Sequence, residues 1–178
     1  MSAPAERLGA EVKWEGTVIR AGVERYRHAD GTEVTRDKVW HPGAVGILAL
    51  DDEHVWLTRQ PREIVGAGDS LEIPAGKLDV PGEPPIETAK RELAEEIGKR
   101  AEHWEELLAF YTSPGISDER LWLYVASDLA DAPHADPDED ERIEIVPWPL
   151  AQLDDAISQC EDGKSLIALL WLAARRRA

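Results

Sequence analysis

Three glutamates within one short segment have the types and spacing of a site for a hard cation. Residues 86–97 carry apolar side chains at intervals of three and four, which predicts an amphipathic helix. At 100° per residue, Glu92 and Glu96 lie on one flank of the apolar stripe centred on Leu93. Glu95 lies about 160° from the centre of that stripe. Carboxylates four residues apart repel each other, and more strongly beside a core of low dielectric constant, so the pair requires a compensating positive charge.

Two kinds of cation could supply that charge, and the helix alone does not separate them. Basic side chains of the same segment could form ordinary surface ion pairs, because Lys90, Arg91 and Lys99 are close in sequence. Alternatively, a divalent ion such as Mg²⁺ takes oxygen ligands and binds through few carboxylates together with substrate phosphates. Zinc is disfavoured, because Cys160 is the single cysteine and the five histidines have no ligand spacing.

The elements that position this helix are mostly strands. Polar, alternating segments around the turn pair Asp30-Gly31 predict exposed antiparallel strands at residues 12–20, 23–28 and 33–40. Apolar or alternating runs predict further strands at 44–50, 55–60, 71–73, 107–112, 121–126 and 143–146. A loop is expected at 61–70, and helices at 150–160 and 165–177. The chain should therefore consist of an N-terminal antiparallel strand domain, residues 1–42, and an α/β domain, residues 43–178.

Composition excludes several classes of function. The 178 residues carry 36 acids against 20 Lys plus Arg, a net charge of −16, which disfavours nucleic acid and anionic membranes as partners. The longest apolar stretch, residues 166–174, is far shorter than the ~20 residues of a membrane span, and residues 1–12 lack the apolar core of a signal peptide. One cysteine excludes an internal disulfide, so we expect a cytoplasmic protein.

A resemblance separates the two readings of the acidic helix. The stretch Gly76-Lys-Leu-Asp-Val-Pro-Gly-Glu83, seven further residues, and Arg91-Glu92-Leu93-Ala94-Glu95-Glu96-Ile97-Gly98 resembles the Nudix box of the Nudix hydrolases. This loop-helix-loop motif binds Mg²⁺ for diphosphate hydrolysis in an α/β/α sandwich with a mixed sheet. The sequence departs from the motif twice: six residues rather than five separate Gly76 from Glu83, and Lys99 stands where the family prefers an apolar residue.

The resemblance also implies the roles of the box residues. The metal ligands that it implies are Glu92 and Glu96, with Glu95 contributing and the carbonyl of Ala75 as a further ligand. Glu83 and Arg91 would brace the motif. Mg²⁺ is the expected ion, with Mn²⁺ as the alternative.

Flanking residues are similar to the ADP-ribose pyrophosphatase branch of the family. The similar segments are residues 59–62, 72–76 and 113–119, and Pro114 lies 15 residues beyond Lys99, a spacing that this branch favours. In that branch the N-terminal strands are exchanged within a homodimer. The low apolar content of the first three predicted strands agrees with this, because such strands are poorly stable alone.

The branch implies how a small nucleoside diphosphate sugar would be held. Substrate-binding candidates are Arg59, Arg62, Ser117 and Glu119, with Trp14 as an aromatic platform for the adenine ring. Two of these residues have ordinary alternatives. Arg59 could equally be a surface arginine paired with an acid, and Trp14 could serve in dimer packing.

Water activation is expected from an acidic loop after the box. Residues 131–162 hold eleven acids against the single base Arg142, and by the resemblance Glu139 or Glu141 is the activating carboxylate, with Glu95 assisting. The expected reaction is attack by hydroxide on one phosphorus of ADP-ribose, releasing AMP and ribose 5-phosphate. The alternatives are a GDP-mannose or broader nucleoside diphosphate sugar pyrophosphatase, and a protein that senses ADP-ribose without hydrolysing it.

Overall fold

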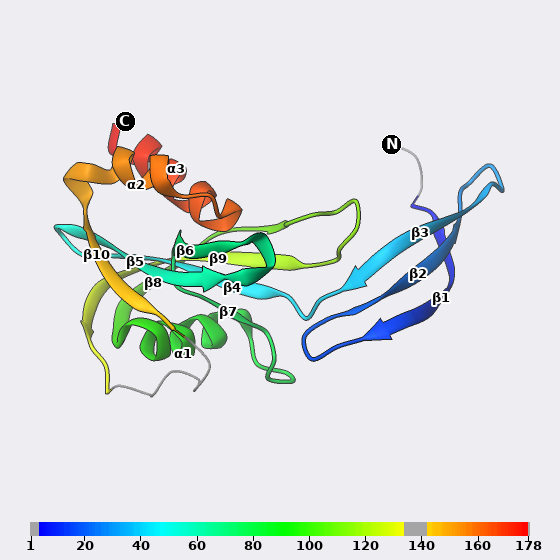
Figure 1. Cartoon of the computed structure of the whole chain (residues 1–178), viewed down its shortest axis with the longest axis horizontal. Helices are drawn as coiled ribbons and strands as arrows, with labels where there is room; N and C mark the ends of the chain where they lie inside the picture. The colour runs from blue at the N-terminus through cyan, green and yellow to red at the C-terminus, as the bar shows by residue number, and fades with distance from the viewer. Residues whose placement is uncertain (1–3, 134–141, 178) are drawn as a thin grey trace. The chain divides into compact units, whose positions relative to one another are not determined.

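A computed structural model describes residues 4–133 and 142–177 of the chain (Figure 1). The chain divides into two compact units. The first comprises Met1–Gly43 and Tyr111–Arg120, and the second comprises Ala44–Phe110 and Leu121–Ala178. No helix of the described ranges is long and apolar enough to span a lipid bilayer.

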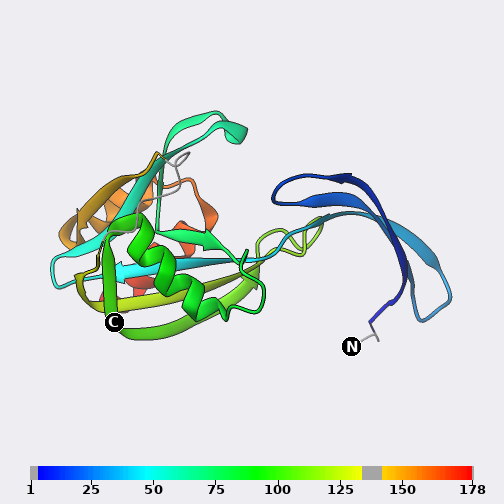
Figure 2. The ribbon, with the colours of Figure 1, turned by 90° about the horizontal axis from the view of Figure 1, so that it is seen from below.

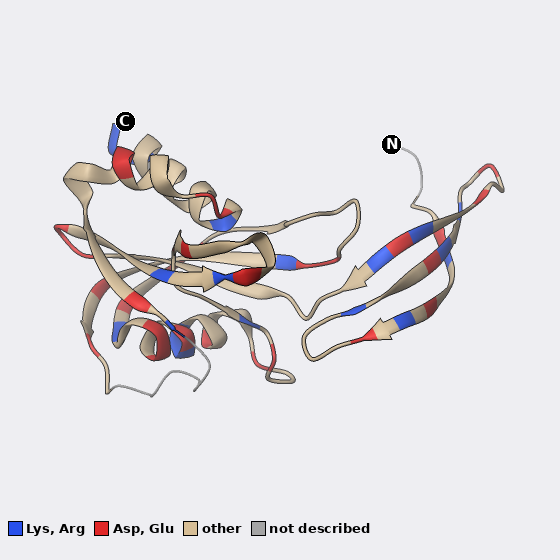
Figure 3. Cartoon of the chain, in the orientation of Figure 1, with Lys and Arg blue, Asp and Glu red and all other residues tan. Residues whose placement is uncertain are grey.

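The first unit contains a three-stranded antiparallel sheet. Its strands are β1 (Glu6–Glu15), β2 (Arg20–Arg27) and β3 (Glu33–Trp40), in the order β1-β2-β3. Acidic and basic residues are intermixed along these strands (Figure 3). The prediction of a first strand at residues 12–20 was wrong, because the chain turns at 16–19, where the Gly16 amide donates to the Ile19 carbonyl at 2.9 Å. The indole of Trp14 lies so close to Gly16 that a Cβ there would be 2.0 Å from the ring, so a larger residue at this turn would displace the indole.

The second unit is built on a seven-stranded mixed sheet. The order β10-β5-β4-β9-β8 is completed by β6 beside β5 and β7 beside β4, and β4 runs parallel to β9. The strands are β4 (Ala44–Leu50), β5 (His54–Arg62), β6 (Ala67–Glu72), β7 (Ala75–Lys77), β8 (Lys99–Tyr111), β9 (Arg120–Asp131) and β10 (Glu144–Pro149).

Helices cover both faces of this sheet (Figures 1 and 2). One face packs against α1 (Pro85–Ile97), and the other against α2 (Leu153–Gln159) and α3 (Gly163–Arg177). Strand β4 shows why both faces are apolar: Val45 and Ile47 pack in the core with α1, and Leu48 packs in the core with α2 and α3. The α/β/α sandwich with a mixed sheet, and the antiparallel N-terminal sheet, are therefore confirmed.

Helix α1 begins and ends where its sequence signals predict. Pro85 occupies the first turn, and Gly98 ends the helix in the left-handed region at φ 63°. The unusual Lys99 is accommodated by its surroundings. Its Nζ lies 2.6 Å from Asp131 Oδ1 and 4.4 Å from the centroid of the Trp56 ring, so the ammonium is paired with a carboxylate and lies over an aromatic face.

Several predicted boundaries of the second unit were wrong. The expected loop at 61–70 is mostly strand, because β5 continues through Pro61 to Arg62 at a bulge and β6 begins at Ala67. Strand β10 passes Pro147, which is tolerated because β10 is an edge strand. The polar N-terminal half of β8 and the short β7 were not predicted.

Candidate metal and diphosphate site

The acidic flank of α1 lies against β7. Glu96 is only 6% exposed, and its Oε2 accepts a hydrogen bond from the Ala75 amide at 2.9 Å. A Cβ added to Gly76 would lie 2.0 Å from Cδ of Glu92 and 2.2 Å from its Oε1. The backbone of β7 therefore approaches both carboxylates so closely that a larger residue at position 76 would displace the Glu92 side chain or β7.

Arg91 is the cation within this acidic group. Its Nη1 lies 2.9 Å from Glu92 Oε1 and 2.7 Å from Glu95 Oε2, and its Nη2 lies 3.7 Å from Glu83 and 3.5 Å from Asp79. Burial lowers the pKa of the Arg91 guanidinium, but Glu92, Glu95 and Glu83 outweigh burial and raise the pKa overall. Arg91 therefore stays charged, and the four carboxylates that it contacts exceed its single positive charge.

The residues of this flank fit a hard divalent cation. Within the described residues, no three Asp, Glu, His or Cys side chains converge closely enough to form a complete cage as they stand. Such a cage is not required, because Mg²⁺ usually keeps several waters and binds through one or two carboxylates plus substrate phosphates. The nearly buried Glu96, the Glu92 carboxylate pressed against Gly76 and the adjoining Ala75 backbone supply oxygen donors of the required kind.

The loop before α1 absorbs its extra residue without disturbing the helix. The Glu83 amide donates to the Val80 carbonyl at 3.1 Å, closing a turn in which Gly82 has φ 82°. The Glu83 carboxylate accepts a hydrogen bond from Thr88 Oγ1 at 2.7 Å, so the loop is tied to the first turns of α1.

The two arginines of β5 have different surroundings. Arg59 lies 3.0 Å from Asp69 and donates to Gln159 at 3.2 Å, which is the ordinary surface pairing raised as its alternative role. Arg62 forms a fork with Glu72, with Nε and Nη2 each 2.7 Å from a carboxylate oxygen. Glu72 is only 2% exposed and also accepts from Lys164 Nζ at 2.5 Å. The part of each arginine in substrate binding stays a prediction.

The buried Glu72 gives a testable dependence of stability on pH. Burial raises the pKa of this carboxyl, but the hydrogen bonds and charges of Arg62 and Lys164 outweigh burial and lower the pKa from 4.5 to about 2. Its stabilising contribution is therefore complete above about pH 4.5 and is lost as the pH falls towards about 2. By this linkage we expect Glu72→Gln to lower the free energy of unfolding at neutral pH by about 3 kcal/mol.

Urea unfolding followed by tryptophan fluorescence measures this effect. The difference in unfolding free energy between wild type and Glu72→Gln should shrink as the pH falls from about 5 towards about 3. The matched control is Glu144→Gln on β10, an exposed carboxylate that should leave the curve unchanged. A difference that stays constant over this range would show that Glu72 does not titrate with its two cations.

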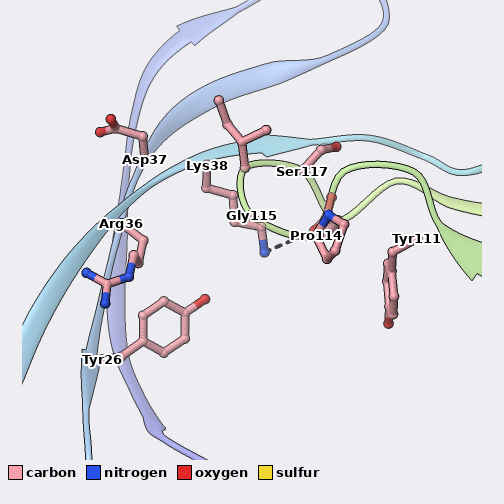
Figure 4. Close-up of a pocket in the computed structure, with 10 residues that line it drawn as sticks. Tyr26, Arg36, Asp37, Lys38, Tyr111, Pro114, Gly115 and Ser117 are labelled. Atoms are coloured by element: carbon pink, nitrogen blue, oxygen red, sulfur yellow. Dashed lines mark ion pairs between the residues drawn. The ribbon is translucent and has the colours of Figure 1, made fainter.

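The first unit contains a pocket of about 500 Å³ (Figure 4). Its lining combines two tyrosines and two cations with a loop, namely Tyr26, Arg36, Asp37, Lys38, Tyr111 and residues 114–118. Lys38 Nζ lies 3.0 Å from Asp118 and 3.2 Å from the buried Glu24. The Tyr26 hydroxyl donates to Glu24, and Arg36 Nη1 donates to the Thr35 carbonyl at 3.0 Å. No ion pair of Arg36 is found within the described part of the chain, so the pocket offers the guanidinium of Arg36 to a polar ligand.

Of the five predicted substrate residues, this pocket includes only Ser117, and Trp14, Arg59, Arg62 and Glu119 are not part of its lining. Ser117 lines it, and Ser117 Oγ accepts from the Glu119 amide at 3.1 Å. The Glu119 carboxylate accepts from Thr112 Oγ1 at 2.5 Å and is not part of the lining. Trp14 is 55% exposed on β1 and also lies outside the lining.

The cations of β3 were not predicted as site residues from the sequence, although Arg36 and Lys38 share one face of the strand by its period of two. Glu139 and Glu141 lie outside the described residues.

Comparison with known proteins gives one family and several close relatives. The NUDIX domain family matches residues 40–169. An ADP-ribose pyrophosphatase of Mycobacterium tuberculosis is 37% identical over 83% of this chain and 72% of that protein. A methanol dehydrogenase activator of Bacillus methanolicus and an ADP-ribose pyrophosphatase of Bacillus subtilis are each 37% identical over 93% of this chain and 90% of those proteins.

A solved structure has the same fold over the whole length. The crystal structure of an ADP compounds hydrolase superposes with a TM-score of 0.83, covering 100% of this chain and 99% of that one, at 24% sequence identity. At this identity the likeness concerns the fold.

Proposed function

We propose, from the premise that the chain belongs to the Nudix hydrolase family, that it hydrolyses the diphosphate bond of ADP-ribose to AMP and ribose 5-phosphate with Mg²⁺ as cofactor. The observation that carries this proposal is the packing of Glu92 and Glu96 against the backbone of β7 at Ala75 and Gly76. The names of two 37% identical relatives support ADP-ribose as the substrate.

In this proposal the acidic flank of α1 holds the metal. Glu92 and Glu96 would be the principal ligands, with the Ala75 carbonyl and Glu95 contributing, and Mn²⁺ could replace Mg²⁺. The bound ion supplies charge stabilisation for the oxygens of the diphosphate. Arg91 holds Glu92 and Glu95 in place through its two short contacts. Arg62, and in second place Arg59, would bind the negative diphosphate through their guanidinium groups.

The proton of the attacking water requires a carboxylate base, and we assign this role to Glu139 or Glu141. We expect only one of the variants Glu139→Gln and Glu141→Gln to lower kcat by about 100-fold, because positioned general bases contribute on that order. Steady-state assays of the two variants side by side identify the residue. If both variants keep full activity, the water is activated by another group.

A substrate panel tests the reaction itself. Values of kcat/KM for ADP-ribose, GDP-mannose and other nucleoside diphosphate sugars should be highest for ADP-ribose, with AMP as a product. The relatives that are 37% identical carry two different names, ADP-ribose pyrophosphatase and methanol dehydrogenase activator, so their names alone do not determine the substrate. A preference for GDP-mannose would replace the substrate assignment, and tight ADP-ribose binding without AMP release in the presence of Mg²⁺ would favour a sensor.

We also propose that residues 1–42 form a dimerising strand domain of a cytoplasmic homodimer, and that residues 43–178 form the hydrolase domain. The three-stranded sheet leaves Val12, Trp14 and Val18 between 42% and 55% exposed, which is apolar surface for a second copy to cover. Trp14 would then pack in the interface or stack on the adenine ring. Light scattering of the full chain tests the dimer, and a monomer at all protein concentrations would contradict it.

A further inference from the structure

A buried network of charges joins β5, β6 and the N-terminus of α3. Glu72, at the end of β6, accepts the fork of Arg62 and a hydrogen bond from Lys164. Lys164 Nζ also lies 2.9 Å from Asp162 Oδ2. The same Asp162 oxygen accepts from the Ser165 amide at 3.0 Å and from Ser165 Oγ at 2.5 Å, so Asp162 caps α3. Two acids and two bases are thus joined in one network, in which Glu72 is buried, Lys164 is nearly buried and Arg62 reaches solvent.

This network holds the segment that leads to the proposed metal ligands. Directly after Glu72, the Ile73 amide donates to Ser165 Oγ at 2.8 Å. Two residues later the Ala75 amide donates to Glu96 at 2.9 Å. Residues 73–75 are therefore tied to α3 at one end and to the acidic flank of α1 at the other.

The network also fixes the orientation of Arg62. The fork to Glu72 uses Nε and Nη2, and within the described residues Nη1 has no hydrogen-bond or ion-pair partner. The Arg62 side chain is 45% exposed, whereas that of Lys164 is 11% exposed. The hydrogen bonds and charge of Glu72 are the main cause that raises the pKa of Arg62, and Glu96 adds a smaller contribution of the same sign.

We propose that Glu72 and Lys164 are positioning residues for substrate binding, an inference that rests on the proposed diphosphate hydrolysis. Lys164, held by Asp162, fixes the Glu72 carboxylate. Glu72 in turn holds the planar guanidinium of Arg62 so that Nη1 faces a phosphate oxygen of the substrate. Holding a long arginine in place before binding removes the entropy cost of ordering it when the substrate arrives.

Two cations, Arg62 and Lys164, contact the Glu72 carboxylate, and their roles differ. Arg62 alone would neutralise Glu72, and Lys164 balances the charge of Asp162 while it also contacts Glu72. Its short contact to Oε2 limits rotation of the carboxylate, and this rotation would swing the arginine fork. Substitutions of Glu72 or Lys164 should therefore weaken the binding of the diphosphate, measured as KM, more than they slow the chemical step, measured as kcat.

The test is a comparison of KM and kcat in single and double variants of the full chain. With ADP-ribose and saturating Mg²⁺, Glu72→Gln should raise KM about tenfold, corresponding to one lost charge-assisted contact, with kcat within about twofold of wild type. Lys164→Met should raise KM by several-fold, and Lys164→Arg should restore it. Asp154→Asn, which removes the exposed partner of Arg177 near the far end of α3, is the matched control with wild-type KM.

The double variant separates positioning from a merely structural role. Arg62→Ala should raise KM by at least as much as Glu72→Gln, and adding Glu72→Gln to Arg62→Ala should raise KM no further, because Glu72 acts through Arg62. Additive effects would overturn the proposal, and so would wild-type KM in folded Glu72→Gln. If Glu72→Gln does not fold, the KM values of Lys164→Met and Lys164→Arg provide the test: a wild-type KM in Lys164→Met would overturn the proposal.

Failure of this inference is distinct from failure of the proposed function. A wild-type protein that hydrolyses none of the nucleoside diphosphate sugars overturns both. A wild-type protein that hydrolyses ADP-ribose, together with network variants that change only kcat or the Mg²⁺ requirement, overturns the positioning role alone.

Discussion

Glu96→Gln should lower kcat about 1,000-fold and leave the fold intact, because it removes a charged ligand of the metal on which the reaction depends. Glutamine keeps the size of the side chain, and its amide oxygen can still accept the hydrogen bond from the Ala75 amide. Glu92→Gln should lower kcat by a similar factor, since Glu92 lies on the same flank of α1. Steady-state kinetics across a Mg²⁺ series, with thermal unfolding by circular dichroism, measures both effects.

The same helix provides a control for this prediction. Glu87 is exposed and, among the described residues, forms an ion pair only with Lys90 at 2.8 Å, so Glu87→Gln should have wild-type kcat and thermal stability. Titration calorimetry adds a direct readout: the wild type should take up Mg²⁺ or Mn²⁺, and Glu96→Gln should bind either ion far more weakly. Near-normal turnover in Glu92→Gln or Glu96→Gln would refute the assignment of the ligands.

Gly76→Ala is expected to have the second-largest effect, and it tests the backbone side of the same site. The added Cβ would lie 2.0 Å from Cδ of Glu92, so the carboxylate or strand β7 must move. Because β7 also carries Ala75, either displacement disturbs the metal ligands, and misplacement by about 1 Å can lower a rate about 100-fold. We therefore expect kcat to fall by about 100-fold or more, with a smaller loss of stability.

Gly68→Ala on β6 is the matched control. A Cβ at Gly68 meets no atom within 4 Å, so this variant should keep wild-type kcat. The kcat values of the two alanine variants and their urea unfolding curves separate loss of the site from loss of the fold. A fully active Gly76→Ala protein would show that the close approach of β7 to Glu92 is not required.

Local patterns accounted for the parts of the molecule that depend on near neighbours. The helix containing Glu92 and Glu96 was predicted at residues 86–97 and is observed at Pro85–Ile97, because its periodicity, its N-terminal proline and Gly98 act within a few residues. Strands β3 and β4 were predicted at their observed bounds for the same reason. The resemblance of residues 76–98 to the Nudix box correctly indicated the family.

Strand boundaries were wrong where tertiary context outweighs local preference. Pro61 and Pro147 favour strand ends by local preference, yet Pro61 lies at a bulge and Pro147 in an edge strand, and neither location is visible in a single sequence. The polar segment 99–106 became strand because its backbone pairs with a neighbour in the sheet, and its side chains give no signal of this.

The sequence by itself determined the acidic helix, the α/β character of the chain and the kind of chemistry that its glutamates can support, because all three follow from residue types and short spacings. Only the tertiary structure decided that Gly76 lies against Glu92, that Arg91 is the cation within the acidic group and that Lys164 reaches Glu72 across 92 positions of the chain. These contacts depend on the register of the sheet and on the packing of α1 and α3 against it. Such long-range geometry is fixed by burial of the whole core, so no local pattern encodes it.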